Sequence, residues 1–133
     1  MSEGRPSRGF LVDTDVLVDY LRGLEAAADW LESADAELFV SAITVAELFA
    51  GVRNKAEQDI LADFLKAFTI VPVDISIARA GGLLKRDYAR SHGTGLADAM
   101  IAATAQELGS VLVTLNRKHF PMVGEVLVPY MKK

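Results

Sequence analysis

Four polar residues of this chain stand where the surrounding apolar pattern predicts a core or crevice position. They are Asp13, Glu47, Asp98 and Asn116. An ionised carboxylate on an inward face costs several kcal/mol unless another charge compensates it, and no inward lysine or arginine is an obvious partner for each. One divalent cation would compensate all three carboxylates together. Mg²⁺ prefers oxygen ligands of this kind and can activate a bound water toward a phosphate, so we predict hydrolytic metal chemistry.

The elements that must position these residues follow a simple alternation. Short apolar runs predict strands at residues 10–12, 37–43, 69–73, 111–114 and 126–128. Helical spacing of apolar residues predicts helices at residues 16–22, 24–33, 44–52, 57–68, 75–91 and 96–108. Strands that alternate with helices indicate βαβ units. We therefore predict an α/β fold with a mainly parallel central sheet of about five strands, flanked by helices on both sides.

Two of the polar residues lie at the ends of predicted strands. Asp13 follows the first strand directly, and Asn116 lies just past the fourth. Ligands of open parallel sheets bind at the carboxyl ends of strands, where the strand order reverses. We expect Asp15 and Thr114 to orient this site by hydrogen bonds. Simpler roles remain open: Asp13 and Asp15 as helix caps, Thr114 as a strand terminus, and Asn116 as a turn residue.

The other two carboxylates are predicted on helices. Asp98 is expected at an inward, mid-helix position beside the core-like Ile101 and Ala102, where no ordinary structural role calls for aspartate. Glu47 is expected in the first helical turn, three residues after Thr44, which is the spacing of a capping box. Glu47 could therefore serve the helix terminus, the metal site, or both.

Composition narrows the class of protein. The chain has no cysteine and two histidines, His92 and His119, which excludes disulfide scaffolds, thiolate metal sites and histidine-rich sites. The net charge of −4 argues against a protein that coats nucleic acid, but less against a nuclease whose carboxylates bind metal first. We predict a flexible tail at residues 1–8, one domain at residues 9–133, and a cytoplasmic location, because no apolar run could span a bilayer.

Four segments resemble the PIN-domain ribonucleases, and most closely the VapC-type toxins of toxin–antitoxin pairs. They are FLVDTDVLV at residues 10–18, TVAELFAG at 44–51, LADAMIAATA at 96–105 and VLVTLNRKHF at 111–120. They occur in the family's order and span nearly the whole chain after the tail. The resemblance implies a PIN-like three-layer sandwich, Mg²⁺ dependence with Mn²⁺ as a substitute, RNA cleavage, a homodimer, and inhibition by a cognate antitoxin.

The resemblance also assigns individual residues. The family's first acidic residue falls on Asp13, its glutamate on Glu47 and its helix aspartate on Asp98. Its fourth polar position, often an aspartate, falls on Asn116, whose neutral oxygen would bind metal more weakly, directly or through water. His119 occupies a position that is acidic in many relatives. Both departures weaken the expectation of a second metal ion.

Three cationic or titratable residues follow the predicted fourth strand. Arg117, Lys118 and His119 lie beside the expected site and could contact substrate phosphates, although a solvated surface turn explains them as well.

Two alternatives to the nuclease remain. One is a non-catalytic PIN-like module that binds only RNA or a partner, which the neutral Asn116 would suit. The other is a receiver-type phosphoacceptor domain, with an acidic pair at Asp13 and Asp15, an acceptor at Asp74, and a possible lysine at Lys132. The receiver alternative leaves two of the three predicted inward carboxylates without a role.

Overall fold

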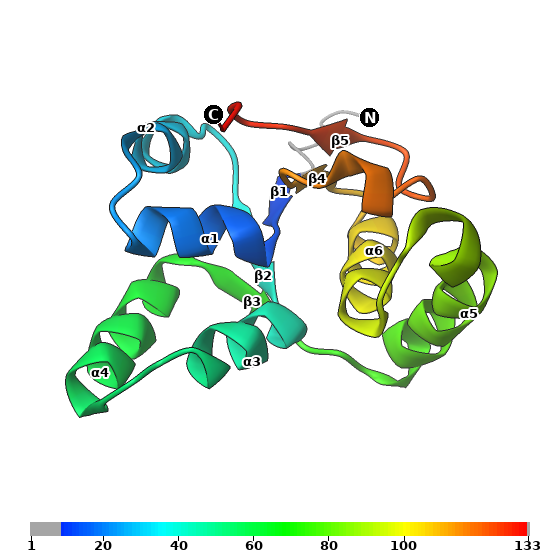
Figure 1. Ribbon diagram of the computed structural model, residues 1–133, viewed down its shortest axis with the longest axis horizontal. Coiled ribbons are helices and arrows are strands. Elements are labelled where there is room, and N and C mark those ends of the chain that lie inside the picture. Colours follow the sequence, from blue (N-terminus) through cyan, green and yellow to red (C-terminus); the bar gives the residue numbers. More distant parts are fainter. Residues whose placement is uncertain (1–8, 133) are drawn as a thin grey trace, which may run out of the picture.

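The computed structural model describes residues 9–132 of the chain (Figure 1). The strands are β1 (Phe10–Val12), β2 (Leu38–Ser41), β3 (Thr69–Val71), β4 (Val111–Val113) and β5 (Val126–Leu127). The helices are α1 (Thr14–Leu21), α2 (Glu25–Ser33), α3 (Ala42–Ala50), α4 (Lys55–Phe64), α5 (Ile75–His92) and α6 (Leu96–Leu108), with short 3₁₀ helices at η1 (Leu65–Ala67) and η2 (Arg117–His119). The predicted alternation of strands and helices is confirmed. The predicted tail at residues 1–8 lies outside the described residues.

The five strands form one parallel sheet in the order β3-β2-β1-β4-β5. The chain moves outward from β1 through β2 to β3, then returns to place β4 on the other side of β1. The strand order therefore reverses between β1 and β4, and this is where parallel sheets bind ligands. A receiver domain has the order 2-1-3-4-5, so the receiver alternative is wrong for this chain.

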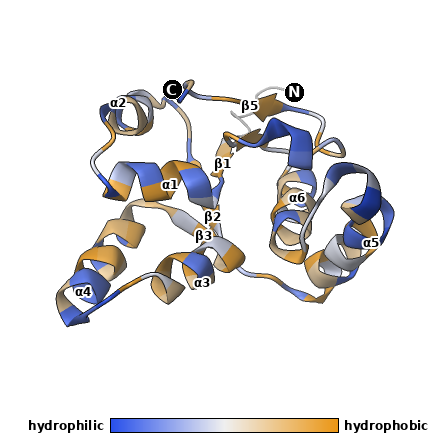
Figure 2. Cartoon of the chain, in the orientation of Figure 1, coloured by the Kyte–Doolittle hydropathy of each residue, from blue (hydrophilic) through white to orange (hydrophobic). Residues whose placement is uncertain are grey.

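Helices cover both faces of the sheet, and the two faces hold separate apolar cores. Val12 and Val113 belong to the core beneath α1, α2 and α4, whereas Leu11 and Leu112 belong to the core beneath α6. Neighbouring residues of a strand point to opposite faces, which explains why these strands are continuously apolar. Figure 1 shows α1, α2 and α4 on one side of the sheet and α5 and α6 on the other. Figure 2 shows hydrophilic residues on the outer surfaces of α4 and α5.

Two predicted boundaries at β2 and α3 are wrong. The strand ends at Ser41, and Ser41 is the N-cap of α3, its hydroxyl accepting a hydrogen bond of 3.0 Å from the amide of Ile43. Thr44 is therefore a buried residue inside the helix and no capping box forms with Glu47. The serine takes the capping role because it stands where the backbone leaves the extended conformation. The strand predicted at residues 69–73 is also shorter: β3 ends at Val71 and lies at the edge of the sheet, because Pro72 has no amide proton to donate to a neighbouring strand.

Helix α5 runs without interruption through two consecutive glycines that differ in surroundings. Gly81 is buried against α6, where a Cβ atom would lie 2.6 Å from Met100 Sδ and 3.2 Å from Met100 Cα. Gly82 has nothing within 4 Å of its Cβ position. Gly81 thus allows close approach of the two helices, and Gly82 has no such function. No described helix has the length and apolar character that a membrane crossing requires.

This difference predicts opposite effects of the same substitution. Gly81→Ala should lower the free energy of unfolding by roughly 1–3 kcal/mol, because the methyl group overpacks the contact with Met100. Gly82→Ala should raise it by roughly 0.5–1 kcal/mol, because alanine loses less backbone entropy in a helix. Urea denaturation followed by circular dichroism measures both. Equal effects of the two substitutions would contradict the assigned packing.

Candidate functional site

The reversal between β1 and β4 creates a cleft at the carboxyl end of the sheet. The amide of Asp13 donates a 2.8 Å hydrogen bond to the Val113 carbonyl, which joins the two strand ends. The cleft is lined by residues from α1 and its caps, α3, α6, the loop after β4 and the segment after β5. They are Asp13, Thr14, Asp15, Val18, Asp19, Arg22, Glu47, Asp98, Asn116 and Lys132. All four polar residues singled out in the sequence therefore lie around one opening.

Asp13 is buried at the centre of this arrangement. Its Oδ1 accepts a hydrogen bond of 2.8 Å from the Thr14 amide, and its Oδ2 accepts one of 2.7 Å from the Thr114 hydroxyl. The residue is the N-cap of α1, one of the roles that the sequence left open, and it also lines the cleft. Burial, followed by the nearby Asp15 carboxylate, raises the pKa of Asp13 to about 7. A nearby positive charge would therefore favour the ionised form of Asp13 near neutral pH.

Asp15 and Thr114 form hydrogen bonds beside Asp13. Asp15 Oδ2 accepts a hydrogen bond of 3.0 Å from the Leu115 amide and lies 3.5 Å from the Thr114 hydroxyl. The Thr114 oxygen in turn accepts a hydrogen bond of 3.1 Å from the Asn116 amide. Burial raises the pKa of Asp15 as well. Asp15 Oδ1 is buried and has no hydrogen-bond partner among the described residues, so the site contains an uncompensated polar atom.

Glu47 approaches the cleft from the second turn of α3. Its side chain is exposed, so its predicted inward position is wrong, although it does line the cleft. Glu47 Oε1 accepts a 2.6 Å hydrogen bond from the Thr14 hydroxyl, whose oxygen lies 2.9 Å from the hydroxyl of buried Thr44. Thr14 has a single hydroxyl proton, so Thr44 donates to Thr14 and Thr14 donates to Glu47. Two threonines thus hold this carboxylate.

Asp98 lies in the first turn of α6, not at the predicted mid-helix position. A carboxylate in a first turn is stabilised by the helix dipole, so Asp98 has an ordinary structural role after all. The helix begins at Leu96, as predicted, and its N-cap residue is Gly95. Ile101 and Ala102 on the same helix are buried as predicted. Asp98 Oδ2 lies 3.3 Å from Nδ1 of His119.

The cationic residues of the cleft differ from those singled out in the sequence. Arg117 donates to a backbone carbonyl of β5, Lys118 is exposed, and His119 faces one of the carboxylates. Within the described residues, the cleft lining contains one arginine, Arg22, and one lysine, Lys132. Sequence reasoning overlooked both in this role, because no local pattern indicates that the segment after β5 returns to α1. It also overlooked Asp19, although its spacing of four residues from Asp15 placed both on one helix face.

The carboxylates of the cleft are not gathered into a compact metal-binding group. Across residues 9–132, no three histidine, cysteine, aspartate or glutamate side chains are gathered as a metal-binding group. Glu47 contacts Thr14 and Asp98 contacts His119. The donor set, the raised pKa of Asp13 and the unpartnered Asp15 oxygen nevertheless fit a hard divalent cation.

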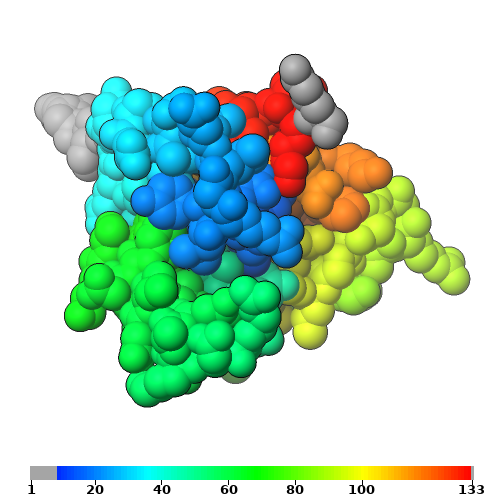
Figure 3. All heavy atoms as spheres, turned by 60° about the vertical axis from the view of Figure 1, so that its left-hand side comes forward, coloured from blue at the N-terminus to red at the C-terminus, as the bar shows by residue number. Residues whose placement is uncertain are grey.

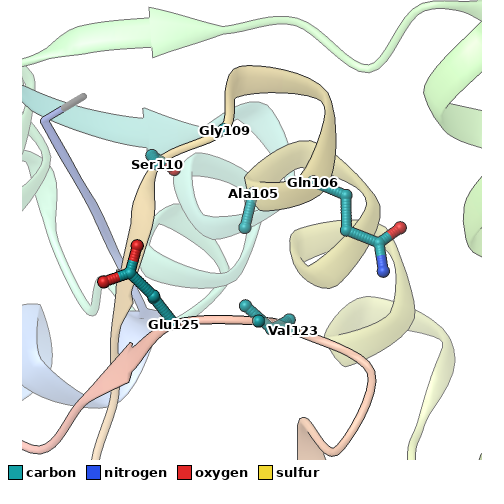
Figure 4. A pocket seen from close by; sticks show the side chains of 7 residues that line it. Ala105, Gln106, Gly109, Ser110, Val123 and Glu125 are labelled. Carbon is teal, nitrogen blue, oxygen red and sulfur yellow. The ribbon is translucent and has the colours of Figure 1, made fainter.

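A second hollow lies at the opposite end of the sheet, where β4 and β5 begin. Figure 4 shows the side chains that line it. The lining residues are Ala105, Gln106, Gly109, Ser110, Val123, Gly124 and Glu125. It holds a single carboxylate and shares no residue with the cleft. The chemistry-bearing residues are therefore concentrated at the carboxyl end of the sheet.

The chain matches one known protein family over most of its length. The family model described as "PIN domain" matches residues 10–125. The chain is 43% identical over 123 residues to Ribonuclease VapC10 of Mycobacterium tuberculosis, covering 90% of this chain and 92% of that protein. It is 41% identical over 124 residues to Ribonuclease VapC19 of the same organism, covering 90% of this chain and 98% of the relative.

Solved structures give the same result. A toxin–antitoxin complex from Klebsiella pneumoniae contains a chain with a TM-score of 0.78 and 30% identity, covering 90% of this chain and 97% of the other. FitAcB from Neisseria gonorrhoeae matches with a TM-score of 0.72 and 32% identity, again covering 90% and 97%. The α/β architecture predicted from the sequence is that of these proteins.

The raised pKa of Asp13 predicts an unusual dependence of stability on pH when no divalent cation is present. Between the ordinary aspartate pKa and about 7, the folded chain holds a proton that the unfolded chain has released. Protonation therefore stabilises the fold at low pH, and this stability declines as the pH rises through that interval. Between about pH 5.5 and about pH 8 the loss should reach roughly 2 kcal/mol.

Asp13→Asn should remove most of this dependence and raise the melting temperature at about pH 8 in EDTA. The substituted amide keeps an acceptor for the Thr14 amide and removes the buried charge. Thermal melts of both proteins at the two pH values measure the effect. A lower melting temperature of the variant at about pH 8 would contradict the interpretation of Asp13 as an uncompensated charge.

Proposed function

This chain belongs to the PIN-domain family, and from this premise we propose that it is a VapC-type endoribonuclease that serves as the toxin of a toxin–antitoxin pair. The proposal depends chiefly on one observation: carboxylates from α1, α3 and α6 meet around one cleft where the strand order reverses. Relatives at 41–43% identity carry the name ribonuclease, and the similar solved structures include a toxin–antitoxin complex.

We propose that Asp13, Glu47 and Asp98 bind Mg²⁺, for which Mn²⁺ would substitute, with Asn116 as a weaker ligand through water. The support is chemical. These residues offer oxygen donors, Asp13 resists ionisation without a nearby cation, and one Asp15 oxygen is buried without a partner. Within the described residues, no lysine or arginine forms an ion pair with Asp13 or Glu47. A divalent cation would supply the missing positive charge.

The chain's own residues would then hold the reacting groups in place. Thr114 and the Thr14 amide orient Asp13, and the Thr14 hydroxyl orients Glu47. When bound, the cation lowers the pKa of a water molecule and stabilises negative charge on the phosphate. RNA phosphodiester hydrolysis by this route needs no protein nucleophile. Asp15 and Thr114 act as positioning residues for Asp13.

Partners follow from the same family. We propose a cognate antitoxin protein as inhibitor, in line with the toxin–antitoxin complex among the similar structures. We also propose a homodimer that acts in the cytoplasm, which is what the family resemblance implies.

Cleavage of RNA tests the catalytic proposal against the non-catalytic alternative. Asp13→Ala and Asp98→Ala should each lower the rate of cleavage of single-stranded RNA about 100-fold or more, because each removes a proposed metal ligand. Asp63→Ala is the matched control, since Asp63 is exposed on α4, pairs with Lys66 and is not part of the cleft lining. Cleavage that survives both variants and excess EDTA would refute the metal mechanism.

Absence of cleavage by the parent chain in Mg²⁺ and in Mn²⁺ would instead favour the module that only binds. The exposed, neutral Asn116 is the feature that keeps this alternative open. Binding of RNA without cleavage, under conditions in which the protein is folded, would establish it.

Metal binding can also be measured without activity. Millimolar Mg²⁺ or Mn²⁺ should raise the melting temperature, because a ligand that binds the folded state stabilises it by mass action, about 2.7 kcal/mol at 100 times Kd. Asp98→Asn should reduce the increase strongly, whereas Asp63→Asn should leave it unchanged. An equal increase in all three proteins would indicate nonspecific binding and contradict the proposed site.

A further inference from the structure

The segment after β5 returns to α1 and ends beside the cleft. Figure 3 shows this red segment next to the blue surface of α1. Two side chains attach it to Asp19 on α1: the Tyr130 hydroxyl donates a 2.8 Å hydrogen bond to Asp19 Oδ2, and Lys132 Nζ lies 2.9 Å from Asp19 Oδ1. Residues from the two ends of the domain are thus joined at the opening that holds the carboxylates.

Asp19 is well suited to anchor this segment. The residue is only 5% exposed, and both of its carboxylate oxygens are occupied by Tyr130 and Lys132. Burial opposes its ionisation, but the hydrogen bonds from Lys132 and Tyr130 hold the pKa of Asp19 below its usual value. Asp19 is therefore an anion near neutral pH and is already paired, unlike Asp13.

Lys132 retains capacity to bind a second anion. Its side chain is 52% exposed, and only one of its three N–H donors is needed for Asp19. It lines the cleft together with Arg22, the C-cap residue of α1. The guanidinium of Arg117, by contrast, is directed to a β5 carbonyl. Lys132 and Arg22 thus carry the positive charge that the cleft itself presents.

We propose that Lys132 and Arg22 bind backbone phosphates of the RNA strand as it enters the cleft, and that Asp19 and Tyr130 position Lys132 for this contact. The inference rests on the proposed ribonuclease function and extends it to substrate binding. A chain of net charge −4 needs local cations to hold RNA beside several carboxylates. The segment after β5 supplies one of them at a fixed place, because two hydrogen bonds fix its course along α1.

Binding of a single-stranded RNA oligonucleotide tests the phosphate contact. Lys132→Gln should weaken binding several-fold in Ca²⁺ and reduce the dependence of log K on log salt concentration by about 0.7, the value for one phosphate contact of a single strand. Arg22→Gln should act similarly. In Mg²⁺, cleavage by Lys132→Gln should show a raised KM with kcat nearly unchanged, because a backbone-phosphate contact binds the substrate and the transition state equally.

Two control variants remove the same charge elsewhere. Lys66 lies on exposed η1, outside the cleft lining. Lys66→Gln should therefore leave the salt dependence of RNA binding unchanged. Lys118→Gln tests the cationic group that the sequence indicated, and its effect should be smaller than that of Lys132→Gln. A Lys118 effect that equals or exceeds the Lys132 effect would overturn the assignment.

The positioning role has its own readout. Tyr130→Phe leaves the charge unchanged and removes one hydrogen bond to Asp19. Asp19 would then hold Lys132 less firmly, and RNA binding should weaken about two- to threefold. Asp19→Asn removes a negative charge, which by simple electrostatics would tighten binding; if Asp19 positions Lys132, binding should weaken instead. Tighter binding by Asp19→Asn, or a Tyr130→Phe effect on melting temperature alone, would overturn this part.

The outcomes separate this inference from the proposed function. If the parent chain binds and cleaves RNA and Lys132→Gln does so with the same KM and salt dependence, the inference is wrong and the function stands. If the parent chain neither binds nor cleaves RNA, both are wrong. A salt dependence of RNA binding that is reduced in Lys132→Gln, with the Lys66 control unchanged, supports the inference.

Discussion

The burial of one carboxylate, Asp13, between two parallel strand ends is the constraint on which the site depends. A charge in this position is costly unless it is neutralised, hydrogen-bonded or paired. The fold supplies hydrogen bonds from Thr14 and Thr114 but no paired cation within the described residues. The result is a pKa near neutrality. A nearby cation would favour the ionised form of Asp13, and this is the role proposed for Mg²⁺.

The neighbouring structure can be understood as support for that residue. The parallel pairing of β1 with β4 brings Thr114 to Asp13, although about a hundred residues separate them in the sequence. Thr14 holds both Asp13, through its amide, and Glu47, through its hydroxyl. The carboxylates that line the cleft repel one another. The cleft therefore lowers the stability of the fold, as functional sites often do.

The sequence predicted elements well where residue type alone decides the conformation, and poorly where a boundary depends on the neighbouring element. Continuous apolar runs identified all five strands, because residues buried on both faces of a parallel sheet must all be apolar. Helix starts were less certain. Ser41 and Thr44 are both good N-caps by type, and only the end of β2 decided in favour of Ser41. The start of α6 at Leu96 was predicted, and it puts Asp98 in the first turn, so the mid-helix description of Asp98 was wrong and its type has a local explanation in the helix dipole.

The sequence by itself determined the α/β class, the strand ends that carry Asp13 and Asn116, and the oxygen-bearing side chains that line the cleft, because these depend on residue type and on spacing along the chain. Only the tertiary structure decided which charges meet. Glu47 is exposed at the rim, His119 faces Asp98, and the return of the segment after β5 places Lys132 on Asp19. Such contacts depend on packing between distant segments, and no local pattern specifies them. The four predicted polar residues therefore remain, but the cations beside them are different from those the sequence indicated.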